Sequence, residues 1–207
     1  RVDRKTTMDM SLILAACLIS LVGLPHGALD PVIAHRAGLI RSPLSAMQFV
    51  FSYLMVVALV VGFWLLTPTL ALLVFLAISA VHFGRDWQRK LQFGGLGYGL
   101  LILGLPGLFH ADEVVQIFAF LLFGEDPLLA LRALQLMAVL GTLLVVWDIR
   151  GLSLLRRIEL TLLASIAWMI EPLWYFVIYF CGFHSPRHLI PEFLRLEPAH
   201  RVTAFAV

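Results

Sequence analysis

Charged residues are scarce in this sequence: they make up 14% of the 207 residues, whereas hydrophobic residues make up 61%. An average soluble domain is about half apolar and about a quarter charged. A water-soluble core of this size could not hide the surplus, and the mean hydropathy of +0.95 agrees. Several apolar runs approach the roughly 20 residues that cross a bilayer as a helix. The composition therefore excludes an ordinary soluble domain and predicts an all-α, polytopic membrane protein.

Cysteine and excess positive charge are nearly absent as well. Cys17 and Cys181 both lie inside apolar runs, where a thiol usually behaves as a small buried hydrophobe, so no disulfide framework is expected. The net charge is only +2, and the basic residues are scattered between apolar runs. Nucleic acid is not an expected partner, because binding to a phosphate backbone requires a continuous basic face. The N-terminal apolar run lacks a small-residue cleavage site, which argues against a removable signal peptide.

The apolar runs predict about seven crossings joined by short connections. Two of the breaks are sharp, at Thr67-Pro68 and Glu171-Pro172, because proline disfavours helical geometry in the residue before it. No linker, low-complexity tract or repeat divides the chain, so we expect one integral membrane domain over residues 1–207. The predicted crossings are residues 8–24, 44–66, 69–84, 95–123, 128–147, 154–170 and 172–188.

The run over residues 95–123 is the least regular, because Gly104, Pro106 and Gly107 interrupt it. It can be interpreted as one broken crossing or as two partial ones. We expect one net crossing, because only then does His184 reach the membrane face at which the first and third crossings end. Most basic residues then share that face, which the positive-inside rule makes cytoplasmic, although the basic residues at the N-terminus oppose this orientation.

Four histidines lie at the ends of three predicted crossings: His26, His82, His184 and His188. Ionisable groups at membrane depth are rare and usually face the interior of the bundle, where they serve a function. Imidazole is also the commonest side-chain metal ligand. One such histidine alone is more often an interfacial residue bonded to backbone or headgroups. Four together predict a buried metal site with these histidines as its ligands and catalytic residues.

An aspartate follows each of the first two histidines at a distance of four residues: Asp30 after His26, and Asp86 after His82. This spacing brings side chains to one helical face. A metal-binding histidine normally donates its other N–H to a carboxylate or carbonyl, which fixes the ring. The aspartates fit this supporting role. Two alternatives stay open, in which they are solvated helix-end carboxylates paired with arginines, or one of them binds the metal directly.

His184 and His188 have the spacing of two ligands on one helical face. Pro186 lies between them, and Ser185 could cap a new helix with Pro186 as its first residue, which would bend the chain between the two ligands. Four neutral imidazoles suit iron, copper or zinc better than calcium or magnesium. Open positions on iron could bind dioxygen, whereas zinc would activate water for hydrolysis.

Aromatic residues are plentiful around the proposed site: Trp87, Trp168, Trp174, Tyr175, Phe176, Tyr179, Phe180 and Phe183. Their usual role is packing or an interfacial belt. They could instead line an apolar tunnel for a long conjugated substrate that enters from the lipid. The candidate substrate-binding residues are Trp174, Tyr175, Tyr179, Phe180 and Phe183.

Three strings stand out in this order: Pro25-His26-Gly27-Ala28-Leu29-Asp30, His82-Phe83-Gly84-Arg85-Asp86 and Tyr179-Phe180-Cys181-Gly182-Phe183-His184-Ser185-Pro186-Arg187-His188. Together they resemble the signature of the Brp/Blh family of membrane β-carotene 15,15'-dioxygenases, and the resemblance spans most of the chain. It departs from the family pattern at Pro186 and in how soon the chain ends after His188, so truncation at the C-terminus stays open.

The resemblance implies Fe(II) bound by the four histidines. It also implies cleavage of β-carotene by O2 at the central double bond, giving two molecules of all-trans-retinal. In microbial members of the family this retinal supplies rhodopsins, so we expect a multi-pass protein of a microbial plasma membrane with a functional link to a retinal-binding rhodopsin. Two other hypotheses come from different classes: a zinc-dependent membrane lipid hydrolase, and a carotenoid or retinal carrier without enzymatic activity.

Overall fold

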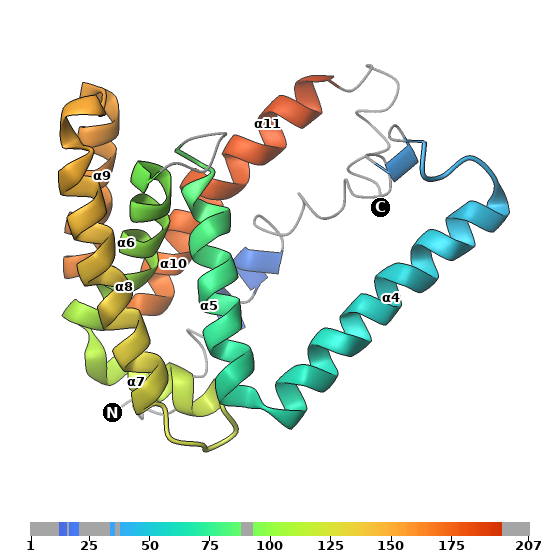
Figure 1. The fold of residues 1–207 in the computed structure, drawn as a ribbon, viewed down its shortest axis with the longest axis horizontal. Coiled ribbons are helices and arrows are strands. Elements are labelled where there is room, and N and C mark those ends of the chain that lie inside the picture. Colours follow the sequence, from blue (N-terminus) through green and yellow to red (C-terminus); the bar gives the residue numbers. More distant parts are fainter. Residues whose placement is uncertain (1–12, 16, 21–33, 36–37, 88–92, 196–207) are drawn as a thin grey trace. The chain divides into compact units, whose positions relative to one another are not determined.

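The computed structural model describes residues 13–15, 17–20, 34–35, 38–87 and 93–195 (Figure 1). All regular structure in these residues is helical, as the composition predicts: α4 to α11, one 3-10 turn and one π-helix from residue 43 to residue 195, and helical residues within 13–15 and 17–20 and at 34–35. The chain forms two compact units. We call residues 62–175 the core unit, and residues 1–61 with 176–207 the terminal unit.

The core unit holds most of the helices, and its central helix is α6, which packs against α5, α8 and α9 (Figure 1). Its elements are α5 (Pro68–Gly84), α6 (Phe93–Phe109), α7 (Ala111–Leu121), α8 (Leu128–Trp147), the 3-10 turn η2 (Ile149–Gly151) and α9 (Leu154–Met169). The last turn of α4 (Pro43–Leu66) and the first residues of α10 (Pro172–Tyr179) also belong to it.

The terminal unit contains most of α4, the end of α10, the π-helix η3 (Phe180–His184) and α11 (Ser185–Arg195). α4 has 24 residues and a mean hydropathy of 2.5, and none of its residues is buried. At about 1.5 Å per residue, a helix of this length exceeds the thickness of the hydrocarbon core. Its composition and length are those of a membrane span.

Proline sets two of the helix starts, as the sequence predicts. Pro68 begins α5 directly after Thr67, and Pro172 begins α10 directly after Glu171. Proline suits the first turn of a helix because its missing N–H would have no helical partner there. Ser153 starts α9 in a different way, because its hydroxyl accepts a hydrogen bond from the Arg156 backbone N–H at 3.4 Å.

Glycines bring α6 very close to its neighbours. A Cβ atom on Gly99 would collide with the carbonyl oxygen of Ala80 in α5, and one on Gly104 would collide with the backbone of Ala138 in α8. Gly141 of α8 meets the α6 backbone in the same way. Small residues at such contacts are typical of membrane helix packing, where close backbone approach replaces the hydrophobic driving force. These glycines therefore fix the spacing of α5, α6 and α8.

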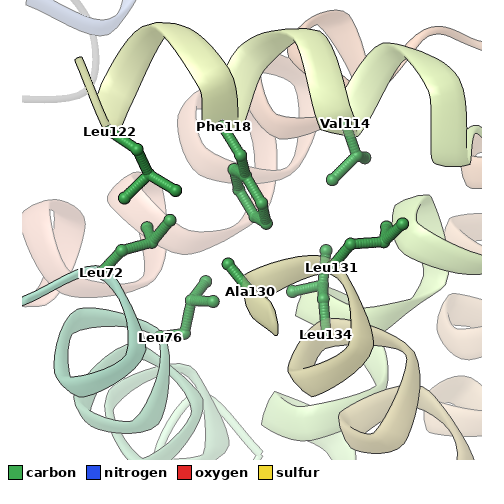
Figure 2. Close-up of a cluster of buried hydrophobic side chains, with 8 residues drawn as sticks. All are labelled: Leu72, Leu76, Val114, Phe118, Leu122, Ala130, Leu131 and Leu134. Carbon is green, nitrogen blue, oxygen red and sulfur yellow. The ribbon is translucent and has the colours of Figure 1, made fainter. Parts of the chain in front are cut away.

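A cluster of apolar side chains ties α7 to α5 and α8 (Figure 2). The indole N–H of Trp64, at the end of α4, adds a hydrogen bond of 3.0 Å to the Leu121 carbonyl. The side chains of the cluster are Leu72 and Leu76 from α5, Val114, Phe118 and Leu122 from α7 and the residue after it, and Ala130, Leu131 and Leu134 from α8.

The predicted crossing over residues 95–123 is broken, and the structure places the break after α6. α6 continues through Pro106 to Phe109, and α7 leaves it at an angle of 107°. In the described residues, α4 and α8 are each long and apolar enough to cross a membrane, and the bent pair α6 and α7 could form a third span. α5 is a shorter apolar helix. The number of seven crossings stays a prediction.

Candidate metal centre

Two of the four candidate ligands lie on one unbroken helical run. α10 leads into the π-helix η3, and α11 follows it directly. His184 ends η3, and Ser185 has helical angles of φ −57° and ψ −46°. Ser185 therefore continues the helix and does not cap a new one, and Pro186 lies in the first turn of α11. The bend that Ser185 and Pro186 could have introduced between the two histidines is not formed.

The rings of His184 and His188 lie close together and are tilted against each other. Their centroids are 4.7 Å apart with an interplanar angle of 53°, and the His184 side chain is buried with 1% of its surface exposed. Two imidazoles at this separation can turn one nitrogen each toward the same cation, because metal–nitrogen bonds are about 2.0–2.1 Å long. The donor set fits a transition metal with nitrogen ligands.

Aromatic rings continue the line of the two histidines back along the helix. Phe176 stacks on Phe180 with centroids 5.4 Å apart, and Phe180 stacks on His184 at 5.3 Å and 20°. With His188 these rings follow one another at every fourth residue, which is the spacing of neighbours on one helical face. We call Phe176, Phe180, His184 and His188 the ring ladder. It joins an apolar aromatic surface directly to two candidate metal ligands.

The π-helix under the ring ladder is a feature that the sequence did not predict. π-Helical turns are rare and are frequent at functional sites. The Cys181 thiol within η3 donates a weak hydrogen bond of 3.7 Å to the Leu18 carbonyl, inside the terminal unit. Tyr179, just before η3, is buried with 1% exposure, and its ring centroid lies 6.3 Å from that of His184.

His82 and Asp86 lie at the end of α5, in the core unit. The backbone continues in turns beyond Gly84, with the Arg85 N–H bonded to the His82 carbonyl at 3.1 Å and the Asp86 N–H to the Phe83 carbonyl at 3.0 Å. Asp86 therefore lies about one turn beyond His82, as the spacing predicts. The His82 ring is tilted against the Phe83 ring, with centroids 5.7 Å apart.

Of the candidate metal ligands and their supporting aspartates, some lie in the described residues and some do not. His26 and Asp30 lie outside the described residues. His82 and Asp86 belong to the core unit, and His184 and His188 to the terminal unit. The structure thus brings together His184 and His188, and the assembly of the full ligand set stays a prediction.

The sequence pointed to Trp87 as an aromatic residue near the proposed site, but it did not predict the side chains that surround it. The Trp87 ring stacks on Tyr98 with centroids 4.3 Å apart, and the Arg156 guanidinium lies 5.8 Å from the Trp87 ring centre. The Tyr98 hydroxyl donates a hydrogen bond of 2.9 Å to Glu159. These side chains hold the turn after α5 against α6 and α9. No local motif reveals them, because they are far apart in the sequence.

The five candidate substrate residues have different surroundings. Phe180 belongs to the ring ladder, whereas Trp174 and Phe183 are half-buried. Tyr175 has 3% of its surface exposed, and its hydroxyl donates a hydrogen bond of 3.0 Å to the Ile102 carbonyl in α6. The Tyr175 hydroxyl thus forms a hydrogen bond within the core unit.

The described residues form a helical chain with apolar candidate spans, in which two close imidazoles lie beside stacked aromatic rings and could serve as metal ligands. A family model described as β-carotene 15,15'-dioxygenase matches residues 17–205. The β-carotene 15,15'-dioxygenase of the uncultured marine bacterium 66A03 is 32% identical over 190 residues, which cover 84% of this chain and 66% of that protein. No solved structure matches.

The chain belongs to the β-carotene 15,15'-dioxygenase family. This confirms the resemblance carried by the three histidine-containing strings. The chain spans 66% of the length of the curated relative.

Proposed function

We propose that this protein cleaves β-carotene at its central double bond with O2 and releases two molecules of all-trans-retinal. Membership of the family supports the reaction, because the matched relative has the name β-carotene 15,15'-dioxygenase. The observation that carries the proposal within the structure is the ring ladder. It puts two imidazoles that can share a cation at the end of an aromatic surface that suits a flat, apolar polyene.

We propose that His26, His82, His184 and His188 together hold Fe(II). The contact between the His184 and His188 rings supports this set. When bound, Fe(II) supplies the ability to activate O2, which imidazole-ligated iron with open positions can do. The histidines themselves remain neutral ligands and leave the ion its full charge.

Asp30 and Asp86 take the supporting role in this proposal. Each carboxylate accepts the second N–H of the histidine four residues earlier, which holds that ring in one tautomer. The turn that separates His82 from Asp86 is consistent with this role. Direct binding of Asp86 to the metal is the alternative within the same proposal, and the two roles predict different responses to substitution.

An apolar wall fixes which bond of the polyene is cleaved. We assign this wall to Phe180 of the ring ladder, and we propose that Trp174, Tyr179 and Phe183 also contact the substrate. Position matters because an error of about 1 Å in the reacting geometry can cost about 100-fold in rate. A rigid aromatic surface next to His184 supplies such positioning without polar groups that would need partners.

The proposed location of the protein in the cell depends on its substrate and on its apolar helices. β-Carotene is dissolved in membrane lipid, so we propose a multi-pass protein with seven crossings in a microbial plasma membrane. Candidate spans such as α4 and α8 support this arrangement. The retinal formed there is a chromophore for a rhodopsin in the same membrane.

Expression in a bacterial host that accumulates β-carotene tests the reaction. The wild-type chain is expected to bleach the cells and to yield all-trans-retinal by chromatography. His184→Ala and His188→Ala are expected to abolish retinal formation, because either change removes a ligand. His35→Ala is the matched control, since that side chain is exposed, and it should leave the yield unchanged.

The outcomes separate the proposal from its competitors. Unchanged carotenoid with a well-expressed wild-type chain would contradict the proposal and favour a carrier. Retinal formation at the wild-type level by His184→Ala would exclude that ring as an essential ligand. A bound zinc ion together with hydrolysis of lipid esters or amides in the absence of oxygen would favour the hydrolase.

A further inference from the structure

Helix α6 contains a proline that removes one of its own hydrogen bonds. Pro106 has no backbone N–H, so the Ile102 carbonyl, four residues earlier, has no helical donor. Ile102 is buried with 1% of its surface exposed, so solvent water does not reach it to replace the missing donor. A buried carbonyl without a partner is unfavourable, most of all at membrane depth. The helix nevertheless continues for three residues beyond Pro106, to Phe109.

The Tyr175 hydroxyl supplies the donor that Pro106 lacks. It donates a hydrogen bond of 3.0 Å to the Ile102 carbonyl, and the two residues are 73 positions apart in the sequence. Phenylalanine would fill the same space and leave the carbonyl without a donor. Pro106 and Tyr175 are therefore structurally linked. Pro106 leaves the Ile102 carbonyl of α6 without a helical donor, and the Tyr175 hydroxyl of α10 donates the hydrogen bond to it.

The bond also constrains the start of the helical run that carries two of the candidate ligands. Tyr175 lies in the first turn of α10, and the same helical run continues through η3 to His184 and His188. An apolar helix surface alone permits small slides and rotations, because dispersion contacts have little directionality. A hydrogen bond to one particular carbonyl is directional, so it favours one height and one rotation of the first turn of α10 against α6. The ring-ladder residues follow Tyr175 on the same helical run, so the bond acts on the start of the segment that carries them.

We propose that Tyr175 is a positioning residue for the metal-binding histidines, and that it acts by replacing the amide that Pro106 removes from α6. This inference rests on the proposed function, because it takes His184 and His188 to be the metal ligands that the Tyr175 hydrogen bond positions. Its buried hydroxyl engages α6, so Tyr175 acts through the helix and not by touching the polyene.

A double-mutant cycle with Pro106 tests the link. Tyr175→Phe is expected to lower kcat for retinal formation by about tenfold with little change in KM, because coupled neighbours commonly show effects of this order. Pro106→Ala restores an N–H that can bond to the Ile102 carbonyl. In the Pro106→Ala background the change Tyr175→Phe is therefore expected to cost less than about threefold. Tyr53→Phe on α4, where Tyr53 is exposed, is the matched control.

A spectroscopic readout separates positioning from general stability. Purified protein loaded with ferrous iron and treated with nitric oxide gives an electron paramagnetic resonance spectrum whose rhombicity depends on the ligand geometry. Tyr175→Phe is expected to change that rhombicity at unchanged iron content, and Pro106→Ala is expected to move it back. This readout needs no turnover, so it tests the link between Pro106 and Tyr175 even if the wild-type chain forms no retinal.

Three outcomes would overturn the inference. One is a Tyr175→Phe protein with wild-type kcat and an unchanged spectrum. A second is a loss of kcat of the same factor in both backgrounds, since the hydroxyl and the missing amide would then be independent. The third is a Tyr175→Phe protein that loses iron and stability together and regains neither with Pro106→Ala, which would reduce Tyr175 to a packing residue.

Discussion

His184 differs from an ordinary buried histidine in the rings that lie next to it. The Phe180 ring stacks on it with centroids 5.3 Å apart, and the His188 ring centroid lies 4.7 Å away. Stacking limits rotation of the imidazole about its last torsion angle, which otherwise has a broad minimum. A ligand held in this way loses less freedom when a cation binds. If His184 binds the metal as proposed, the Phe180 ring supports it without being a ligand.

Asp86 is the residue whose role a substitution series can decide. Asp86→Asn keeps the size of the side chain and can still accept an N–H bond but has no charge. If Asp86 supports His82, iron affinity should fall by about 10–100-fold, and Asp86→Ala should weaken it further. The affinity can be measured by competition with a chelator. Asp126→Asn is the control, because Asp126 is an exposed acid that accepts a hydrogen bond from the Leu128 N–H, which asparagine can also accept.

The result also separates the two roles of Asp86. Direct ligation predicts that Asp86→Asn already loses far more than about 100-fold in iron affinity, because a neutral amide oxygen is a much weaker ligand than a carboxylate. A graded loss supports the outer role. Wild-type affinity in both variants would remove Asp86 from the site altogether.

At the scale of the helices, α6 carries the tightest packing. A methyl group on Gly99 would meet the Ala80 carbonyl oxygen and would lie 2.7 Å from the Gly84 amide nitrogen. Both neighbours are backbone atoms and cannot rotate away. The spacing between α5 and α6 would have to increase, and α5 is the helix that ends at the His82 turn.

Gly99→Ala is therefore expected to destabilise the fold by about 1–3 kcal/mol, the usual cost of overpacking. The measurement is the thermal unfolding midpoint in detergent, followed by circular dichroism. Gly62→Ala is the matched control, because nothing lies within 4 Å of a Cβ at Gly62, and alanine is the better helix former. Equal midpoints for the two variants would contradict the close packing of α5 and α6.

Prolines show which element boundaries the sequence could reveal. Pro68 and Pro172 start α5 and α10 where they were predicted, because the local geometry of proline decides those positions. Pro106 was expected to belong to a break, and the helix instead runs to Phe109. The Tyr175 hydroxyl satisfies the carbonyl that Pro106 leaves free, and a contact between such distant residues leaves no trace in a local pattern.

The π-helix is a second element beyond the reach of sequence reasoning. The spacing of His184 and His188 correctly predicted that their rings would meet, since neighbours at four residues share a helical face. The wider turn from Phe180 to His184 has no signature in composition or spacing. The turn at Trp87 is similar, because its partners Tyr98 and Arg156 come from other helices.

For the molecule as a whole, composition was the most informative feature. Low charge and high hydropathy predicted an all-helical chain, and the described residues confirm it. Family membership agrees with the motifs, which distant parts of the chain contribute in a fixed order. The ligand set beyond His184 and His188 depends on how these parts assemble, and local patterns do not determine that assembly.

The most direct measurement of the central claim follows the oxygen atoms. Purified wild-type protein is loaded with Fe(II) and incubated with β-carotene under 18O2, and the retinal is reduced at once to retinol to prevent exchange with water. Cleavage of one double bond by one O2 gives two aldehydes with one oxygen each. We predict that both product molecules carry 18O and that His184→Ala forms neither. Product oxygen derived from water, or full activity of His184→Ala, would contradict the account.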